Sequence, residues 1–306
     1  MIWNPIESLD LGILHLRFYS MTWLLAFTCG WYITKPIFAK EKESLVKLES
    51  LLIWTVLATF LGARLGHVFF YQWDYFQNHL LEILLPFRFE PEFEFTGFQG
   101  LASHGAAIGI IVSMYFFSKK IMEKPILWVL DRIVIPVSCG AIFIRIGNFI
   151  NSEIYGKIVA GQPFYGVKFV KEEEFWRTNN LFELTHSQTA KEGFHKLTND
   201  PAYADILAQI PYRHPAQLYE AILYIPVFLI LLFLYWKTNV SEKKGFLFGV
   251  FLILLWSIRF MIESVKESQG GFESALGMFS TGQWLSIPFI LMGFFFVVTA
   301  QRPVRN

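Results

Sequence analysis

The chain has 306 residues, of which 54% are hydrophobic and only 17% are charged. This composition is typical of an integral membrane protein, and a net charge of +1 gives no support to a nucleic-acid partner. Both cysteines, Cys29 and Cys139, lie inside apolar runs, which argues against a disulfide framework. The start of the chain lacks a basic leader followed by a cleavable apolar core, so we expect no signal peptide.

Seven apolar runs are long enough, or nearly so, to cross a hydrocarbon core of about 30 Å. In chain order they cover residues 18–38, 51–73, 101–118, 126–151, 216–236, 245–263 and 283–300. We therefore predict an all-α polytopic membrane protein with about seven transmembrane helices.

Two polar segments separate these runs. In the segment 74–100, the stretch FRFEPEFEF alternates aromatic and charged residues with a period of two. It is either an arm on the outer membrane surface, with its Phe face toward lipid, or an edge strand packed on a polar domain. Residues 152–215 are dense in charges and turn formers and should form a small head domain. The predicted domains are 1–151 (helices one to four with the arm), 152–215 (the head) and 216–306 (helices five to seven).

Lysine and arginine in the short loops predict the orientation, because cytoplasmic loops carry an excess of both. With the N-terminus outside, the cytoplasmic side receives Lys35, Lys40, Lys42, Lys47, Lys119, Lys120, Lys124, Lys237, Lys243, Lys244, Arg302 and Arg305. The opposite short segments hold only Arg17, Arg88 and Lys266. The arm and the head then lie outside, and the C-terminus is cytoplasmic.

This topology places costly polar residues from several helices at one depth in the outer leaflet. They are Tyr19, Arg64, His104, Arg145, Asn148, Glu220, Arg259 and Glu263. A charged side chain near mid-bilayer costs about 2.5 to 3.5 kcal/mol, so such residues normally face a protein interior and mark a function. Arg132 lies near the cytoplasmic end of its span, where we expect it to snorkel or to lie at the surface.

The stretch AIFIRIGNFINSEIYG at 141–156 is the most informative, because it introduces polar groups into an apolar run of membrane length. Arg145, Asn148 and Asn151 are spaced three apart, so on a continuous helix they line one stripe, and Glu153 follows. The stripe is either a donor-rich wall for an anion, or Arg145 pairs with a buried carboxylate and fixes helix packing.

The chemistry of this layer suits an anionic lipid head group. Arginine offers planar donors that match phosphate oxygens, and the candidates are Arg64, Arg145 and Arg259. Three carboxylates, on Glu153, Glu220 and Glu263, could hold those guanidinium groups. His104, in GLASHGAAIG, suits a general base near neutral pH or is a structural histidine.

Other chemistries have no support in the sequence. It has no HExxH, paired Asp, Cys cluster or Gly-rich nucleotide loop, so we expect no metal and no cofactor. The residues alone do not decide between an enzyme and a phospholipid transporter or scramblase with the same basic pocket. A transporter should have paired inverted halves with discontinuous helices, and no such internal repeat is found.

In chain order, seven motifs resemble those of the bacterial prolipoprotein diacylglyceryl transferases. They are RFYSMTW at 17–23, GARLGHVFFY at 62–71, GLASHGAAIG at 100–109, RIGNFINSEIYG at 145–156, RHPAQLYE at 213–220, RFMIE at 259–263 and GQWLSIP at 282–288. The resemblance covers nearly the whole chain except residues 157–213.

The resemblance implies transfer of the diacylglyceryl group of phosphatidylglycerol to the lipobox cysteine thiol in the signal peptide of a prolipoprotein. It implies a bacterial inner-membrane protein with membrane lipid as a partner, and the loop charges place its site in the outer leaflet. The positions matching catalytic residues are Tyr19, His104, Arg145, Asn148 and Arg259. The positions expected to bind substrate are Arg64, Asn151, Glu153, His214, Glu220 and Glu263.

The implied mechanism uses the arginines to neutralise the lipid phosphate and His104, or alternatively His214, to help deprotonate the thiol. The chain also departs from the family pattern. Ile144 and Ala106 replace common glycines, and His67 replaces an aromatic residue. Beyond Glu263 an arginine and a Pro-Asp pair are usual in the family. This chain has Lys266, Ser268 and Gln269 there.

Overall fold

The structure is a computed structural model that describes residues 1–10, 15–89, 92–95, 100–267 and 278–300. The chain divides into two compact units. Unit 1 combines Met1–Gly30 with Val134–Asn306, and unit 2 is Trp31–Ile133. Ser268 and Gln269, two of the departures from the family pattern, lie outside the described residues.

All seven predicted runs are helical. The helices are α1 (Phe18–Lys40), α2 (Leu45–Tyr71), α4 (Ser103–Phe117), α5 (Ile126–Ile150), α10 (Ala216–Lys237), α11 (Phe246–Ile262) and α13 (Thr281–Thr299). Among the described residues, five helices are long and apolar enough to cross a membrane, and α11 is apolar but shorter. A largely helical polytopic membrane protein is therefore confirmed, whereas the count of seven spans stays a prediction.

Local sequence signals explain where several of these helices begin. Ser44 caps α2 by accepting a hydrogen bond from the backbone N–H of Lys47. Ser280 and Gln283 form a reciprocal capping box at the start of α13. Each of α1, α5, α10 and α13 contains one proline, which membrane helices tolerate because neighbouring groups satisfy the freed backbone carbonyl.

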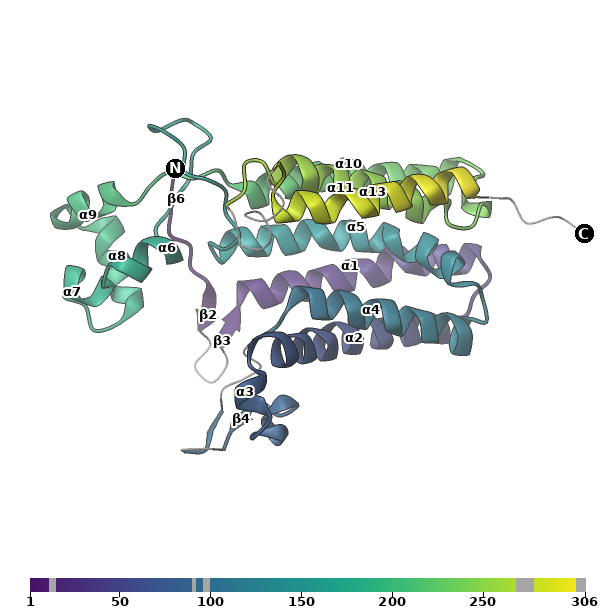
Figure 1. The fold of residues 1–306 in the computed structure, drawn as a ribbon, viewed down its shortest axis with the longest axis horizontal. Coiled ribbons are helices and arrows are strands. Elements are labelled where there is room, and N and C mark those ends of the chain that lie inside the picture. Colours follow the sequence, from purple (N-terminus) through teal and green to yellow (C-terminus); the bar gives the residue numbers. More distant parts are fainter. Residues whose placement is uncertain (11–14, 90–91, 96–99, 268–277, 301–306) are drawn as a thin grey trace, which may run out of the picture. The chain divides into compact units, whose positions relative to one another are not determined.

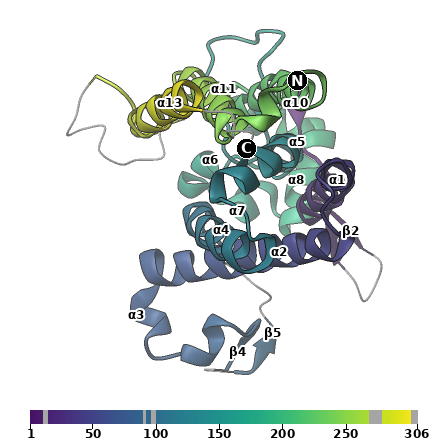
Figure 2. The ribbon, with the colours of Figure 1, turned by 90° about the vertical axis from the view of Figure 1, so that its right-hand side faces the viewer.

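In unit 2, α2 and α4 pack side by side through small residues (Figure 2). A Cβ atom on Gly62 would lie 2.5 Å from the carbonyl oxygen of Gly105 and 3.1 Å from Cα of Gly109. A Cβ on Gly66 would lie 2.6 Å from Cα of Gly105. These glycines therefore let the two backbones approach closely, as their four-residue spacing suggests. A π-helical turn, η2 (Ser118–Met122), continues α4.

The predicted arm is a compact segment of unit 2. It contains α3 (Trp73–Phe76), η1 (Leu80–Ile83), β4 (Phe87–Arg88) and β5 (Glu94–Phe95). Strands β4 and β5 pair antiparallel, and an ion pair of 3.5 Å joins Arg88 to Glu94 across the hairpin. Among the described residues, the strands of the FRFEPEFEF stretch pair only with each other. Its exposed rings, Phe89 and Phe93, fit the membrane-surface alternative, which stays a prediction.

The expectation of a surface role for Arg132 is wrong. Its side chain is only 4% exposed, and its guanidinium donates to the carboxylate of Glu41, 2.6 Å away. It also lies over the ring of Trp128, 4.3 Å from the centroid. Because Glu41 and Trp128 supply these contacts inside unit 2, Arg132 is a buried paired cation.

In unit 1, α10, α11 and α13 form a layer of adjacent helices (Figures 1 and 2). Gly249 on α11 and Gly293 on α13 meet at the closest point, where a Cβ on either would lie 2.8 Å from the other's carbonyl oxygen. A short turn, η4 (Val240–Glu242), joins α10 to α11.

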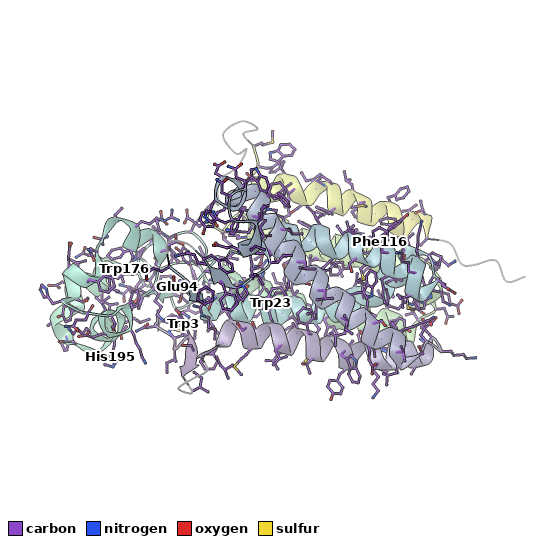
Figure 3. The ribbon with its side chains drawn as sticks, turned by 90° about the horizontal axis from the view of Figure 1, so that it is seen from below. Trp3, Trp23, Glu94, Phe116, Trp176 and His195 are labelled. Atoms are coloured by element: carbon purple, nitrogen blue, oxygen red, sulfur yellow. The ribbon has the colours of Figure 1, made fainter. Side chains whose placement is uncertain are left out.

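The segment between α5 and α10 carries small helices, shown in Figure 3 around Trp176 and His195. They are α6 (Glu173–Thr178), α7 (Leu181–Thr185), α8 (Ala190–Asn199), η3 (Pro201–Tyr203) and α9 (Ala204–Gln209). They enclose an apolar core of Val170, Leu181, Leu197 and Ile210. We call residues 152–215 the head.

The N-terminal residues join this part of unit 1. Strand β1 (Ile2–Trp3) pairs parallel with β6 (Lys168–Phe169). The indole N–H of Trp3 donates to the carbonyl of Phe149 at the end of α5, 3.0 Å away. A separate hairpin pairs β2 (Ser8–Asp10) with β3 (His15–Arg17) just before α1. The first strand thus ties the head to the end of α5.

The close approach of α2 and α4 makes a specific prediction. Gly62→Ala should destabilise the protein by about 1 to 3 kcal/mol, because the added methyl group overlaps the backbone of α4. Gly30→Ala is the control, because its Cβ would meet only Cβ of Pro136 at 3.7 Å, and alanine favours a helix by about 1 kcal/mol. Measured by thermal unfolding in detergent, Tm should therefore fall for Gly62→Ala and not for Gly30→Ala. A Tm equal to that of the unmodified chain in both variants would contradict the packing.

Candidate functional site

Unit 1 brings polar residues from α1, α5, α10, α11 and their adjoining turns into one connected group, which we call the polar cluster. Its members are Tyr19, Arg145, Asn148, Glu153, Gln217, Glu220, Tyr224, Arg259, Glu263 and Lys266. Hydrogen bonds, ion pairs and close electrostatic interactions link them. Most of the sequence-predicted residues of unit 1 are therefore found together.

Arg145 is the centre of this cluster. Its guanidinium forms an ion pair with the carboxylate of Glu220 and donates to the side-chain oxygen of Asn148, 3.1 Å away. The hydroxyl of Tyr224 also faces it. The side chain of Glu220 is only 3% exposed. The sequence left open that Arg145 pairs with a buried carboxylate, and this carboxylate is Glu220 on α10.

Glu153 is brought back toward α5 by a strained turn. Ser152 and Ile154 have positive φ angles of 56° and 59°, a conformation that costs free energy in residues other than glycine, most of all in a β-branched one. The Asn148 amide donates to the Glu153 carboxylate at 2.7 Å, and the Gln217 amide donates to the Glu153 carbonyl at 2.6 Å. These bonds to buried partners hold the turn in place.

Tyr19 reaches the same place from α1. Its hydroxyl faces the amide of Asn148 and the indole N–H of Trp23. Gly147 makes the approach possible, because a Cβ there would lie 2.8 Å from the Tyr19 ring. The side chain of Asn151, by contrast, makes no side-chain hydrogen bond with any described residue, and it is not part of the cluster.

Arg259 differs from Arg145 in having no hydrogen-bonded partner among the described residues. Its guanidinium lies near the ring of Trp256, 5.5 Å from the centroid, and it is partly buried. Glu263 follows one turn later, against Gly282 of α13, where a Cβ would lie 2.6 Å from its carboxylate oxygen. Within the described ranges, the guanidinium donors of Arg259 are thus left without an acceptor.

Lys266 is a member of the cluster that the sequence assigned to a short outer loop. Its side chain is only 5% exposed, and its ammonium lies 3.8 Å from the Glu263 carboxylate. A signal that could have identified it is a basic residue only three positions after Glu263, but α11 ends at Ile262, so helical spacing alone does not bring Lys266 to the cluster. Burial lowers the pKa of Lys266.

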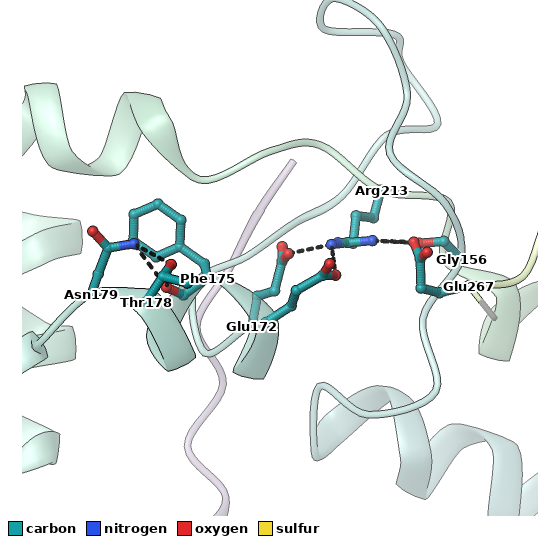
Figure 4. Close-up of polar contacts among 8 residues, drawn as sticks. Gly156, Glu172, Phe175, Thr178, Asn179, Arg213 and Glu267 are labelled. Atoms are coloured by element: carbon teal, nitrogen blue, oxygen red, sulfur yellow. Dashed lines mark hydrogen bonds and ion pairs between the residues drawn. The ribbon is translucent and has the colours of Figure 1, made fainter. Parts of the chain in front are cut away.

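Arg213 lies in the head and holds three carboxylates (Figure 4). Its guanidinium donates to Glu172 and Glu174 at 2.5 Å and to Glu267 at 2.6 Å, and its side chain is 1% exposed. It also donates to the Gly156 carbonyl at 3.4 Å. Burial alone would lower the pKa of Arg213, but these carboxylates raise it instead. Arg213 is thus a permanent cation that joins the head to the residues after α11.

His214 follows Arg213 and precedes α10. Its ring stacks on Tyr165 at 5.5 Å, and its Nδ1 lies 3.3 Å from the hydroxyl of Tyr219. Partial burial lowers the pKa of His214, so the imidazole is neutral at pH 7. None of its contacts reaches the polar cluster.

The remaining two predicted residues belong to unit 2. Arg64 is buried and donates to the backbone carbonyls of Ile83 and Glu82 at 2.8 and 2.6 Å, so it fixes the arm to α2. The exposed imidazole of His104 lies 5.2 Å from the ring of Phe70 and 5.7 Å from that of Tyr71. Within the described ranges, no group of three or more His, Cys, Asp or Glu residues could hold a metal ion.

The ion pair of Arg145 leads to a stability prediction. Glu220→Gln should destabilise the protein by about 3 to 5 kcal/mol, because it leaves a largely buried guanidinium without its counter-charge. Replacing both partners with Arg145→Met and Glu220→Leu should recover much of the loss. Thermal unfolding of the three proteins measures this.

Glu173→Gln is the matched control, since it breaks a pair with Arg177 in which both side chains are more than 70% exposed. It should leave the melting curve unchanged. A loss as large as that of Glu220→Gln would contradict the role of burial.

The His214 environment predicts a pH dependence. Its folded-state pKa is below the ordinary value near 6.5, so the unfolded chain binds the proton more tightly and stability falls as pH drops below about 6.5. His214→Phe keeps an aromatic ring against Tyr165 and cannot titrate. The difference in Tm between pH 8 and pH 5.5 should therefore shrink in this variant. An unchanged difference would show that His214 does not carry the effect.

Comparisons with known proteins agree on one family. A family model described as prolipoprotein diacylglyceryl transferase matches residues 7–299. Proteins named phosphatidylglycerol–prolipoprotein diacylglyceryl transferase are similar to the chain over nearly their full length. The one from Bacteroides fragilis is 33% identical over 96% of this chain and 93% of its own. Those from Chloroherpeton thalassium and Tolumonas auensis are 33% and 32% identical, over 98% and 99% of this chain and 93% and 98% of their own.

Proposed function

The chain belongs to the prolipoprotein diacylglyceryl transferase family, and on that premise we propose that it transfers the diacylglyceryl group of phosphatidylglycerol to a prolipoprotein. The acceptor is the lipobox cysteine thiol of the signal peptide. The observation that carries the proposal for the site is the polar cluster. It holds two arginines from different apolar helices, and Arg259 has donors that no described residue uses.

The reaction is a displacement at carbon. The thiolate attacks the glyceryl carbon that carries the phosphate, a C–S bond forms and the C–O bond breaks. The bonding electron pair leaves with the oxygen of glycerol phosphate. The thiol proton passes to a base, because the thiolate is the nucleophile.

The cations of the cluster fit the charge change in this step. Phosphatidylglycerol carries one negative charge on its phosphate diester, and the departing monoester carries two at the moment of cleavage. A fixed cation therefore stabilises the transition state more than the bound substrate, which is the condition for catalysis. We assign this role to Arg259, while Arg145, which is paired with Glu220 and bonded to Asn148, organises the cluster around it. Tyr19 and Glu153 hold Asn148 from either side.

For the base we propose His104, whose imidazole is exposed and contacts aromatic rings in its own unit. His214 is the alternative, and its lowered pKa leaves it able to accept a proton at pH 7. Comparing His104→Gln with His214→Phe in the transfer assay distinguishes them. The variant that lacks the base should lose rate most at low pH, where little thiolate forms unaided.

We propose seven spans in the bacterial inner membrane, with the N-terminus, the arm and the head in the periplasm and the C-terminus in the cytoplasm. The lysine-rich loops at 35–47, 119–124 and 237–244 support this orientation. Prolipoproteins expose the lipobox on the periplasmic side, so a site near the outer ends of the helices can receive it. Asn151, Glu263 and Arg64 are proposed as supporting residues rather than as groups that touch the reacting atoms.

The test of the proposed function uses purified protein in vesicles of phosphatidylglycerol and phosphatidylcholine with a lipobox peptide. We expect a peptide mass increased by one diacylglyceryl group, together with released glycerol phosphate. Redistribution of lipid between leaflets without any peptide adduct would instead indicate a transporter.

In this assay Arg259→Ala should lower kcat/KM by about 100-fold or more, a loss typical of removing one group that stabilises a developing negative charge. The fold should survive, because the side chain of Arg259 makes no hydrogen bond with any described residue, and its backbone bond to Glu263 does not depend on the side chain. Arg177→Ala, at an arginine that is 71% exposed in the head, is the control and should keep full activity. Equal activity of the two variants would remove Arg259 from the mechanism.

A further inference from the structure

Lys266 is a buried cation that the proposed reaction does not yet use. Its ammonium is 3.8 Å from the Glu263 carboxylate, which is too far for a hydrogen bond. Among the described residues it donates no hydrogen bond at all. The side chain is only 5% exposed, and a phosphate beside it would supply the acceptor that its ammonium lacks among the described residues.

We propose that Lys266 is a further head-group residue, which binds the phosphate of the phospholipid beside Arg259, and that Arg213 positions it. The proposal rests on the proposed function for the identity of the lipid. The chemistry it requires is that of a phosphate diester with one negative charge.

The charges around Lys266 favour such a ligand. It faces Glu263 and Arg259 of α11, Glu220 of α10 and Arg145 of α5. Glu220 is already paired with Arg145. The third carboxylate of the cluster, Glu153, accepts from Asn148 and is not among the groups that face Lys266. Glu263 is then the carboxylate that Arg259 and Lys266 share, and the excess positive charge beside Lys266 matches the single charge of a phosphate diester.

The backbone around Lys266 is fixed by the segment that follows α5. Lys266 forms an antiparallel bridge with Gly156, and the N–H of Lys157 donates to the Val265 carbonyl at 2.8 Å. A Cβ on Gly156 would lie 2.6 Å from both the Val265 carbonyl oxygen and Cβ of His214, so only glycine allows the three segments to meet. Lys266 is therefore not a mobile surface lysine.

Arg213 completes this arrangement from the head (Figure 4). Successive side chains of an extended segment point to opposite faces. Glu267 accordingly reaches Arg213 at 2.6 Å, while Lys266 turns toward Glu263. Arg213 also donates to the Gly156 carbonyl, opposite Lys266 in the bridge. Arg213 thus acts on the site through Glu267 and Gly156, as a positioning residue.

A lysine in this position makes lipid binding depend on pH. Burial shifts its pKa downward, so the ammonium is lost at a lower pH than in an exposed lysine, and phosphate binding weakens as pH rises through that value. An arginine in its place stays charged throughout.

The experiment measures transfer to the lipobox peptide by the full-length protein in nanodiscs with a varied fraction of phosphatidylglycerol in phosphatidylcholine. Lys266→Met should raise the half-saturating lipid fraction about tenfold or more, the loss expected for one hydrogen bond to a charged group, with kcat within about threefold. Lys266→Arg should stay within about threefold of the unmodified protein. Lys191→Met, at an exposed lysine of the head, is the control and should change neither value.

Two further readouts test charge and positioning. The half-saturating fraction of phosphatidylglycerol should rise between pH 7 and pH 9.5 more for the unmodified protein than for Lys266→Arg. Glu267→Gln should raise the half-saturating fraction, and it should add little in combination with Lys266→Met, because both changes act on the same contact.

The proposal is overturned if Lys266→Met binds lipid as well as the unmodified protein, or if Lys266→Arg is as impaired as Lys266→Met. It is overturned for Arg213 if the effects of Glu267→Gln and Lys266→Met simply add. If the unmodified protein yields no adduct, the proposed function fails. The ratio of phosphatidylglycerol to phosphatidylcholine that each protein retains in detergent, measured by mass spectrometry, then tests Lys266 independently.

Discussion

An arginine among apolar helices must be neutralised, and the ion pair between Arg145 and Glu220 meets this requirement. It joins α5 to α10, and the bonds from Arg145 to Asn148 and onward to Glu153 extend it to the strained turn after α5. Because Arg145 is compensated by its own carboxylate, the positive charge available to a ligand comes from α11 and its C-terminal continuation. We therefore distinguish Arg145, which organises the site, from the cations that we propose to hold the anion.

The head contributes to this site through the backbone. Arg213 binds Glu172 of the head and Glu267 after α11. Short bridges pair Gly156 with Lys266 and Ile158 with Arg213, and so connect the ends of α5 and α11 to the start of α10. This arrangement requires positive φ angles at Ser152 and Ile154, which are unfavourable for residues other than glycine. The Gln217 amide, which donates to the carbonyl of Glu153 between them, helps to stabilise this turn. A polar domain at the ends of apolar helices can in this way fix charged side chains that lipid alone would not orient.

Much of this could be predicted from the sequence, because lipid imposes simple rules. Apolar run length located every long helix to within a few residues at most ends. The cost of intramembrane polar groups singled out Arg145, Asn148, Glu220 and Arg259, which the structure brings into one cluster. Partners could not be predicted, because they depend on tertiary contacts. Arg132 is predicted to be a surface residue, because its partner Glu41 is 91 positions away in the sequence. From the sequence, Lys266 is predicted to lie in a loop, because the bridge to Gly156 that holds its backbone depends on tertiary structure. The three carboxylates that Arg213 binds are likewise distant in sequence and could not be assigned to it.

We propose that the cations of α11 and its extension hold the lipid phosphate while Arg145 stays paired with Glu220. An experimental structure of the protein with bound phosphatidylglycerol is the decisive test. We expect phosphate oxygens at about 2.7 to 3.2 Å from the guanidinium of Arg259, with the ion pair of Arg145 intact. A phosphate bound elsewhere, with Arg259 in contact only with protein groups, would contradict it.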